Sequence, residues 1–372
     1  MTKIGLTDLV KIIGLFIVSR ILIVITFLLT NSRFEPIPEK AFYWNYSKNA
    51  FLNYFGYWDT GWYLYVANAG YINTPLGQGQ TNYGFFPFYP LCMKFFGLSF
   101  GDNYIGGIVA SNFFLLVAAT FLFLLCIHIY KQKRTALIAI TVLFFFPGSY
   151  LLSGVFSEAT FVCLTIMSVY YSEKENYFLS GVSGFLATLT RPFGVLLLLP
   201  LSFRYFQKNG IRFKKDILYL ALIPAGILTF FTYCYLTTGD FMLYVHAKES
   251  GWHTEKANVL TILYKGIKHP KDVYYYANTC YTLFILLIVF ALYRFIPFYL
   301  LVWSILLIAA PLANGNVNLI CMPRYILVSF PVMMAVAHFT QKHQVGFFLI
   351  FILAAINFIL CAFYSLGYQF AA

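Results

Sequence analysis

The chain has 372 residues, of which 60% are hydrophobic and only 10% are charged, and its mean hydropathy is +0.75. Soluble globular proteins carry about 25% charged residues, so this composition excludes an ordinary soluble domain and indicates an integral membrane protein. The net charge of +12 does not indicate nucleic-acid binding, because the basic residues fall in short clusters between apolar segments, as the positive-inside rule describes.

Apolar segments of about 20 residues match the hydrocarbon core of a bilayer and predict membrane-spanning helices. The first runs from Val10 to Leu29, and we interpret it as a retained span with the N-terminus in the cytoplasm. The segment after it, Asn31 to Tyr83, then falls outside, and residues 31–100 form the predicted extracytoplasmic catalytic region. Its many Trp and Tyr side chains suit helices that lie in the headgroup zone.

The next segments predict crossings in alternating directions. They cover Tyr104 to Tyr130, Ala136 to Tyr150 and Ala159 to Tyr171. Lys131 and its basic neighbours mark the cytoplasmic side. Ser157 and Glu158 are therefore expected at an outer turn.

The segment from Phe178 to Leu201 presents a conflict. A complete span there would put the basic cluster at 204–215 outside, against the positive-inside rule. Because proline disfavours helix at the residue before it, two half-length helices could reverse at Arg191-Pro192 and return the chain to the cytoplasm. Irregular backbone at membrane depth is tolerated where it lines a site, so this reversal would turn Arg191 toward one. A complete span with an exceptional outer loop is the alternative.

The rest of the chain opens a second outer region and then completes the bundle. Ile217 to Leu236 is a predicted span, and residues 237–279 form the second extracytoplasmic loop. The last predicted spans are Tyr281 to Ile296, Pro297 to Leu312, Tyr325 to Phe339 and Val345 to Leu366. We therefore predict an all-α polytopic membrane protein of about 10–12 transmembrane or half-membrane helices, folded as a single domain over residues 1–372.

Two carboxylates stand apart because their neighbours are apolar. Asp59 lies between Trp58 and Thr60, and Glu158 follows Ser157. Ionisable groups at membrane depth are functional candidates, and Asp59 is a candidate general base. Alternatively, Asp59 caps the helix that follows it. Glu158 is either a second acid that binds a divalent ion or positions an acceptor hydroxyl, or an acidic residue stabilised by a helix dipole.

Basic residues near these carboxylates are candidate phosphate ligands. Arg191 and Arg324 lie in apolar surroundings, and a guanidinium can clamp phosphate oxygens with two hydrogen bonds. A structural ion pair is the alternative for Arg191, and snorkelling to the interface is the alternative for Arg324. His246 and Lys248 could also meet the phosphate.

Aromatic side chains complete the predicted site. We expect Trp58, Trp62 and Tyr89 to contact the sugar or its acceptor. No HExxH, Walker A or Rossmann glycine pattern is present, so a zinc protease site and nucleotide-binding folds are not expected. A Mg²⁺ or Mn²⁺ ion held by Asp59 and Glu158 is the one cofactor that this arrangement suggests.

Five blocks of residues follow one another along the chain: Trp58-Asp59 with Gly70-Tyr71, Phe86-Pro87-Phe88-Tyr89-Pro90, Phe146-Pro147 through Ser157-Glu158-Ala159, Ala187-Thr188-Leu189-Thr190-Arg191 with Gly194, and Pro323-Arg324-Tyr325 with Pro331. In this order they resemble the PIG-V-like mannosyltransferases, which have the GT-C architecture. The chain departs from the family in its modest outer loops and in Tyr63, where a His is often found after the WD pair.

The resemblance implies a GT-C fold and inverting transfer of a sugar, mannose in this family, from a polyprenyl-phosphate donor to a lipid-linked or glycan acceptor at the extracytoplasmic face. It assigns Asp59 as a base or metal-linked acid and makes Glu158, Arg191 and Arg324 site residues. The expected partners are this donor, a glycolipid or glycan acceptor and membrane lipids, without nucleic acid. The expected location is a prokaryotic plasma membrane, or the ER membrane in a eukaryote. A polytopic transporter or flippase of the cell envelope is the alternative, since broken helices and buried charges also mark transport sites.

Overall fold

The structure is a computed structural model, and it describes residues 4–37, 44–72, 80–210, 212, 214–252, 258–268, 270, 272–313, 319 and 321–371. Five helical segments in this part of the chain are long and apolar enough to cross a membrane. They contain α1 (Leu6–Asn31), α5 (Asn103–Tyr130), α10 (Leu222–Thr238), α13 (Val273–Leu292) and α17 (Gly346–Leu366). Each corresponds to a predicted span.

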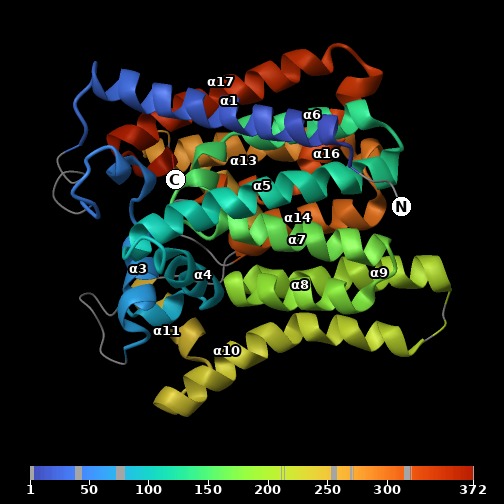
Figure 1. The fold of residues 1–372 in the computed structure, drawn as a ribbon, viewed down its shortest axis with the longest axis horizontal. Coiled ribbons are helices and arrows are strands. Elements are labelled where there is room, and N and C mark those ends of the chain that lie inside the picture. Colours follow the sequence, from blue (N-terminus) through green and yellow to red (C-terminus); the bar gives the residue numbers. More distant parts are fainter. Residues whose placement is uncertain are drawn as a thin grey trace.

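Shorter helices fill the space between these five. They are α6 (Lys133–Phe145), α7 (Glu158–Glu173), α8 (Tyr177–Thr190), α9 (Leu198–Asn209), α14 (Phe298–Ala313) and α16 (Phe330–Lys342). Figure 1 shows them side by side with the long helices, with α1 and α17 along one edge and α10 along the other. Residues of α5, α6, α7 and α16 supply much of the buried apolar core.

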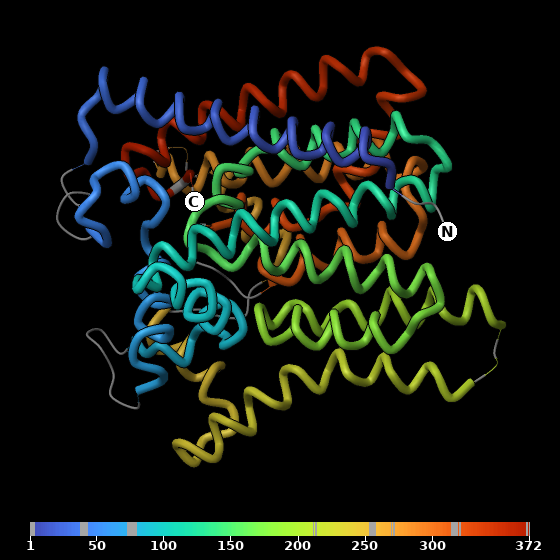
Figure 2. Tube along the Cα trace, viewed as in Figure 1, coloured from blue at the N-terminus to red at the C-terminus, as the bar shows by residue number. Residues whose placement is uncertain are grey.

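Short helices gather at one end of this bundle, which we call the loop end. These helices are α3 (Thr60–Ala69), α4 (Phe88–Gly97), α11 (Leu243–Trp252), α12 (Val259–Lys268) and α15 (Met322–Leu327). Figure 1 shows α3, α4 and α11 together there, and Figure 2 shows the beginning of α1 and the end of α9 at the opposite end. Both regions predicted to be extracytoplasmic therefore lie at the same end.

The chain reverses between α8 and α9, as a pair of half-length helices would. Arg191 has extended backbone, with φ −149° and ψ 138°, as a residue before proline prefers. After the reversal, α9 brings Arg204 back to the end of α7, where its Nε and Nη2 donate to the Glu173 carboxylate at 2.7 and 3.1 Å. Lys208 Nζ donates to the Glu173 carbonyl at 2.7 Å. The alternative of one complete span does not describe this structure.

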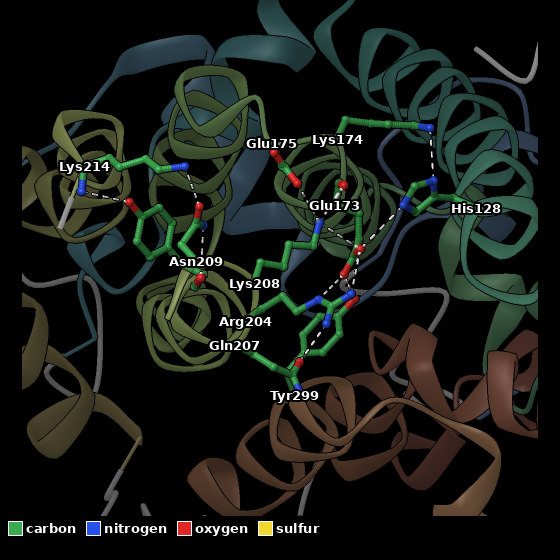
Figure 3. Close-up of polar contacts among 11 residues, drawn as sticks. His128, Glu173, Lys174, Glu175, Arg204, Gln207, Lys208, Asn209, Lys214 and Tyr299 are labelled. Atoms are coloured by element: carbon green, nitrogen blue, oxygen red, sulfur yellow. Dashed lines mark hydrogen bonds and ion pairs between the residues drawn. The ribbon is translucent and has the colours of Figure 1, made fainter. Parts of the chain in front are cut away.

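We call the end opposite the loop end the basic end. It holds a cluster of polar side chains around the buried Glu173 (Figure 3). Besides Arg204 and Lys208, this carboxylate accepts a hydrogen bond from Tyr299 at 2.6 Å and lies 3.6 Å from His128. One acidic side chain thus joins α5, α7, α9 and α14. The cluster fixes the base of the α8–α9 hairpin and so determines where its tip, Arg191, lies.

Small residues let the hairpin pack closely against α10. A Cβ on Gly226 would lie 2.6 Å from the Phe185 carbonyl, and one on Gly184 would lie 2.5 Å from the Ile223 side chain. Glycine at such contacts allows two helix backbones to approach within a membrane. The approach holds α8, and with it Arg191, at a defined depth.

The arrangement of the ends predicts the result of labelling from outside the membrane. We expect cysteines at Lys131 and Lys214, both exposed at the basic end, to be protected from an impermeant thiol reagent, and one at His246 to react. The background should carry Cys280→Ser, because Cys280 is the one exposed native cysteine. Labelling of intact cells, with detergent-opened cells as the control, measures this. Equal labelling of positions 214 and 246 would contradict the predicted topology.

Candidate active site

Asp59 occupies the position directly before α3 at the loop end. It stands at the N-cap, but its side chain makes no capping hydrogen bond, so the capping alternative does not hold. The preceding residue, Trp58, has φ +44°, which is uncommon for a bulky residue. Its ring is held by Trp44, Tyr57 and Tyr364, at centroid distances of 5.2, 5.4 and 5.8 Å. These rings stabilise a strained turn that directs the Asp59 carboxylate into the bundle.

Glu158 begins α7 and is fully buried. The backbone before it is tied to the helix that follows Asp59: Thr60 Oγ1 donates to the Val155 carbonyl at 3.0 Å. One turn further along α3, the Tyr63 hydroxyl and Ser157 Oγ lie 2.8 Å apart. Hydrogen bonds between α3 and the segment 155–157 thus set the two acidic residues relative to one another.

Arg324, on α15, joins the two carboxylates. Its Nε donates to Glu158 Oε1 at 2.5 Å, and its Nη1 donates to Asp59 Oδ2 at 2.6 Å. Arg191 Nη1 lies 2.8 Å from the same Glu158 oxygen. We call Asp59, Glu158, Arg191 and Arg324 the ion cluster. Its two carboxylates balance its two guanidiniums, as buried charges require.

Exposure distinguishes the members of the ion cluster. Arg324 is 2% exposed, which excludes snorkelling to the interface, and Glu158 is 0% exposed. The Asp59 side chain is 27% exposed, so it is the carboxylate that an entering molecule meets. Oδ1 of Asp59 takes no hydrogen bond from any described residue, and neither does the buried Oε2 of Glu158. Asp59 Oδ1 thus remains open to an entering ligand, whereas Glu158 Oε2 is an enclosed acceptor.

Lys248, on α11, places a further positive charge beside the ion cluster. Its ammonium lies 4.1 Å from the centre of the Trp252 ring and 4.7 Å from that of Phe85. Burial lowers the pKa of Lys248 to about 8, although the Asp59 charge favours the protonated form. Among the described residues no carboxylate pairs with it, so its charge is available to an anion.

The other predicted contact residues lie in different settings. Trp62 stacks on Phe85 at 5.8 Å and contacts Trp252 edge-on, so it belongs to the wall around Lys248. Tyr89 is fully buried, and its hydroxyl is 2.9 Å from Ser111 Oγ, which puts it behind that wall. His246 is exposed and bonds Asp240 at 2.7 Å. The structure does not bring His246 to the ion cluster.

Comparison with known proteins places the fold. No family model and no curated protein matches the chain. ArnT from Cupriavidus metallidurans, in a structure bound to undecaprenyl phosphate, matches with a TM-score of 0.57 at 11% identity, over 91% of this chain and 62% of that one. The Archaeoglobus fulgidus oligosaccharyltransferase in complex with Zn and sulfate matches with a TM-score of 0.50 at 15% identity, over 95% and 53%. The fold is that of the GT-C membrane glycosyltransferases.

This likeness has a defined extent. The chain spans less than two thirds of the length of either matched protein. Together with the five apolar helices, it establishes a multi-pass membrane protein with a GT-C fold. The identities are too low to carry over an activity.

Two site residues, Tyr63 and Trp252, were not among those predicted. Tyr63 follows Asp59 by four residues and therefore lies on the same face of α3. Trp252 follows Lys248 by the same spacing on α11. Helical spacing from an already suspected polar residue is the signal that could have identified both.

The geometry fits a divalent cation poorly. The Arg324 guanidinium lies between Asp59 and Glu158 and occupies one oxygen of each. No group of three His, Cys, Asp or Glu side chains suited to a metal occurs in the described part of the chain. Mg²⁺ prefers several carboxylate or water oxygens and would here sit against a guanidinium. We therefore derive no step through a metal.

The bridging position of Arg324 predicts a large effect on stability. Arg324→Met should lower the free energy of unfolding by about 3–5 kcal/mol, because it leaves the Asp59 carboxylate unpaired and Glu158 with one partner. Arg294→Met is the matched control, since Arg294 is exposed and donates a hydrogen bond to its neighbour Tyr293, and it should change stability by less than about 0.5 kcal/mol. Thermal unfolding in detergent, followed by Trp fluorescence, compares them. Equal unfolding midpoints would argue against a structural role for the bridge.

Proposed function

We propose that this protein is an integral membrane glycosyltransferase. It transfers a sugar, mannose by the PIG-V-like sequence resemblance, from a polyprenyl-phosphate donor to a lipid-linked or glycan acceptor at the extracytoplasmic face. The observation that carries the proposal is the ion cluster at the loop end of a GT-C fold, with a partly exposed Asp59 and, beside it, Lys248, which pairs with no carboxylate of the described residues. The fold comparison supports this reading over a transporter.

In the proposed reaction Asp59 acts as the general base. The acceptor hydroxyl donates to Asp59 Oδ1, the one oxygen of this carboxylate that Arg324 leaves open. As the hydroxyl oxygen bonds to the anomeric carbon, its proton passes to Asp59. The bond from the anomeric carbon to the phosphate oxygen breaks, and its electron pair leaves with the polyprenyl phosphate. Attack opposite the leaving group inverts the anomeric configuration, and the phosphate needs no strong acid because it is already a stabilised anion.

The donor phosphate is proposed to lie between Arg191 and Lys248. Arg191 lies over the Tyr325 ring, with its guanidinium carbon 5.2 Å from the ring centre. One of its nitrogens pairs with Glu158, and its other nitrogens are proposed to bind phosphate oxygens. Lys248 adds a charge that no carboxylate in the described part of the chain neutralises. Arg324, with both carboxylates attached, serves mainly to hold Asp59 and Glu158 in place. The matched ArnT structure is bound to undecaprenyl phosphate, which supports a lipid phosphate as the ligand class.

The direct test is incubation of the purified protein with polyprenyl-phosphate mannose and candidate glycolipid acceptors. We expect a mannosylated acceptor with inverted anomeric configuration, detected by mass spectrometry and NMR. A parallel reaction with EDTA should proceed at the same rate, as the donor set around the ion cluster implies. Transport of the lipid without a new glycosidic bond would overturn the proposal in favour of a flippase.

Asp59→Asn should abolish transfer while leaving folding near normal. The amide keeps the shape of the carboxylate but cannot accept the proton, and loss of a general base costs about 10²–10⁴ in rate. The rate of transfer by the purified variant, with its thermal midpoint as the folding control, measures this. Activity within about threefold of wild type would remove Asp59 from this role.

The pKa of Lys248 predicts that binding of polyprenyl phosphate, the leaving group, depends on pH. Its pKa is lowered to about 8, so the ammonium is charged below that pH and neutral above it. The affinity for polyprenyl phosphate should therefore fall as pH rises through about 8. Lys248→Met should remove this step. His246→Ala, on the same helix but exposed, is the matched control and should retain it. An unchanged pH profile in Lys248→Met would exclude this lysine as a phosphate ligand.

A further inference from the structure

Arg20 is a second arginine site at membrane depth, in the middle of α1 and outside the ion cluster. Its guanidinium reaches across to the connection between α6 and α7. Nη1 donates to the Ser149 carbonyl at 3.1 Å and to Ser153 Oγ at 2.9 Å, and Nη2 donates to the Phe144 carbonyl at 3.2 Å. Nε donates to Ser19 Oγ at 3.1 Å. Three of these four hydrogen bonds leave α1, and all three end on residues 144–153.

The partners of Arg20 are all neutral. No carboxylate among the described residues forms an ion pair with it, in contrast to Arg191 and Arg324. A charged side chain within a membrane is costly and is rare without a specific purpose. The Phe144 carbonyl lies in the last turn of α6, where no helical amide follows to donate to it, and the Ser149 carbonyl lies at the start of the 3-10 helix Ser149–Ser153. Arg20 satisfies them with a rigid fork that lysine could not reproduce.

Side chains from two other helices hold the same connection. Ser153 Oγ donates to Asn112 Oδ1 at 2.8 Å, and the Ser149 amide donates to Asn357 Oδ1 at 3.0 Å. Arg20, Asn112 and Asn357 come from α1, α5 and α17. Three helices therefore converge by hydrogen bonds on the short 3-10 helix Ser149–Ser153.

That segment leads directly into the ion cluster. Two residues after Ser153, the Val155 amide donates to the Phe55 carbonyl at 2.6 Å, and Thr60 Oγ1 returns a bond to the Val155 carbonyl. Phe55 and Thr60 flank Asp59, and Glu158 follows three residues after Val155. A shift of residues 149–155 would thus move both carboxylates that Arg324 joins.

We propose that Arg20 is a positioning residue that fixes the α6–α7 connection and thereby sets the separation of Asp59 and Glu158. Its effect on catalysis rests on the proposed function, but its effect on the geometry does not. The guanidinium acts through backbone carbonyls and the Ser153 hydroxyl, and it touches no substrate.

Hydrogen exchange tests the positioning role without any assay of activity. In Arg20→Met, the amides of Ser149, Leu151 and Val155 should exchange at least about tenfold faster, since the connection loses its anchor, while those of α10 keep their rates. Lys11→Met is the matched control, because Lys11 is an exposed cation on the same helix, and it should change neither region. Unchanged exchange over 149–155, or an equal rise throughout the protein, would overturn the proposal.

Kinetics then test the consequence for the site. Arg20→Met should lower kcat about 10- to 100-fold, as expected for a misplaced catalytic group, with a smaller change in KM for the donor. Arg20→Lys keeps the charge and one or two donors, so it should recover part of the loss. A change in KM for the donor without a fall in kcat, or full activity of Arg20→Met, would contradict the proposal.

Two further outcomes are distinguishable. If the Arg20 variants fail to fold, Ser153→Ala replaces them, because it removes only the hydroxyl that accepts from Arg20 Nη1. Faster hydrogen exchange confined to residues 149–155 would then support the proposal. Unchanged exchange there would overturn it. If Arg20→Met loosens this segment but the wild type transfers no sugar, the positioning role stands and the proposed function fails.

Discussion

The bridge from Arg324 to Asp59 and Glu158 is the interaction on which the rest of the site depends. Each of these charges is expensive to bury alone, by several kcal/mol, and they become tolerable only when held at hydrogen-bond distance. The bridge joins the start of α3 to α7 and α15. Asp59 and Glu158 are 99 residues apart along the chain, and Glu158 and Arg324 are 166 residues apart. The packing of the bundle must therefore satisfy one local geometry that no single helix can provide.

Two anchors at different depths meet this requirement. At the basic end, Glu173 fastens the α8–α9 hairpin, whose tip presents Arg191 to Glu158. Nearer the loop end, Arg20 and the asparagines of α5 and α17 hold the connection that carries Glu158. Both anchors place polar groups where helices break, because breaks leave carbonyls and amides that a membrane cannot solvate. The irregular backbone that brings the site residues together thus creates the need for the buried polar side chains that fix it.

The sequence predicted what depends on local pattern. Spans from apolar length, and the reversal at Arg191-Pro192 from proline chemistry and charge bias, have short-range signals. The pairing of Arg324 with both carboxylates has none, because sequence does not give distances between helices; the sequence predicts Arg324 as a phosphate ligand and does not predict the bridge. His246 and Lys248 illustrate the same limit. They are two residues apart on one helix, and only the direction in which α11 packs decides that Lys248 faces Asp59 while His246 faces outward.

The balance of charge in the ion cluster bears on how the proposed transfer is accelerated. Two guanidiniums and two carboxylates cancel, so the cluster offers little net attraction to the single negative charge of a phosphodiester donor. When the glycosidic bond breaks, the departing phosphate monoester carries additional negative charge, and Lys248 is a nearby cation that no carboxylate of the residues described above neutralises. A charge held in a low-dielectric setting between Trp252 and Phe85 interacts more strongly with the departing phosphate than with the intact donor. Stabilisation that grows along the reaction coordinate raises the rate, whereas stabilisation of the bound donor would not. In the proposed transfer, the neutral ion cluster orients the reacting groups, and Lys248 supplies the differential electrostatic effect.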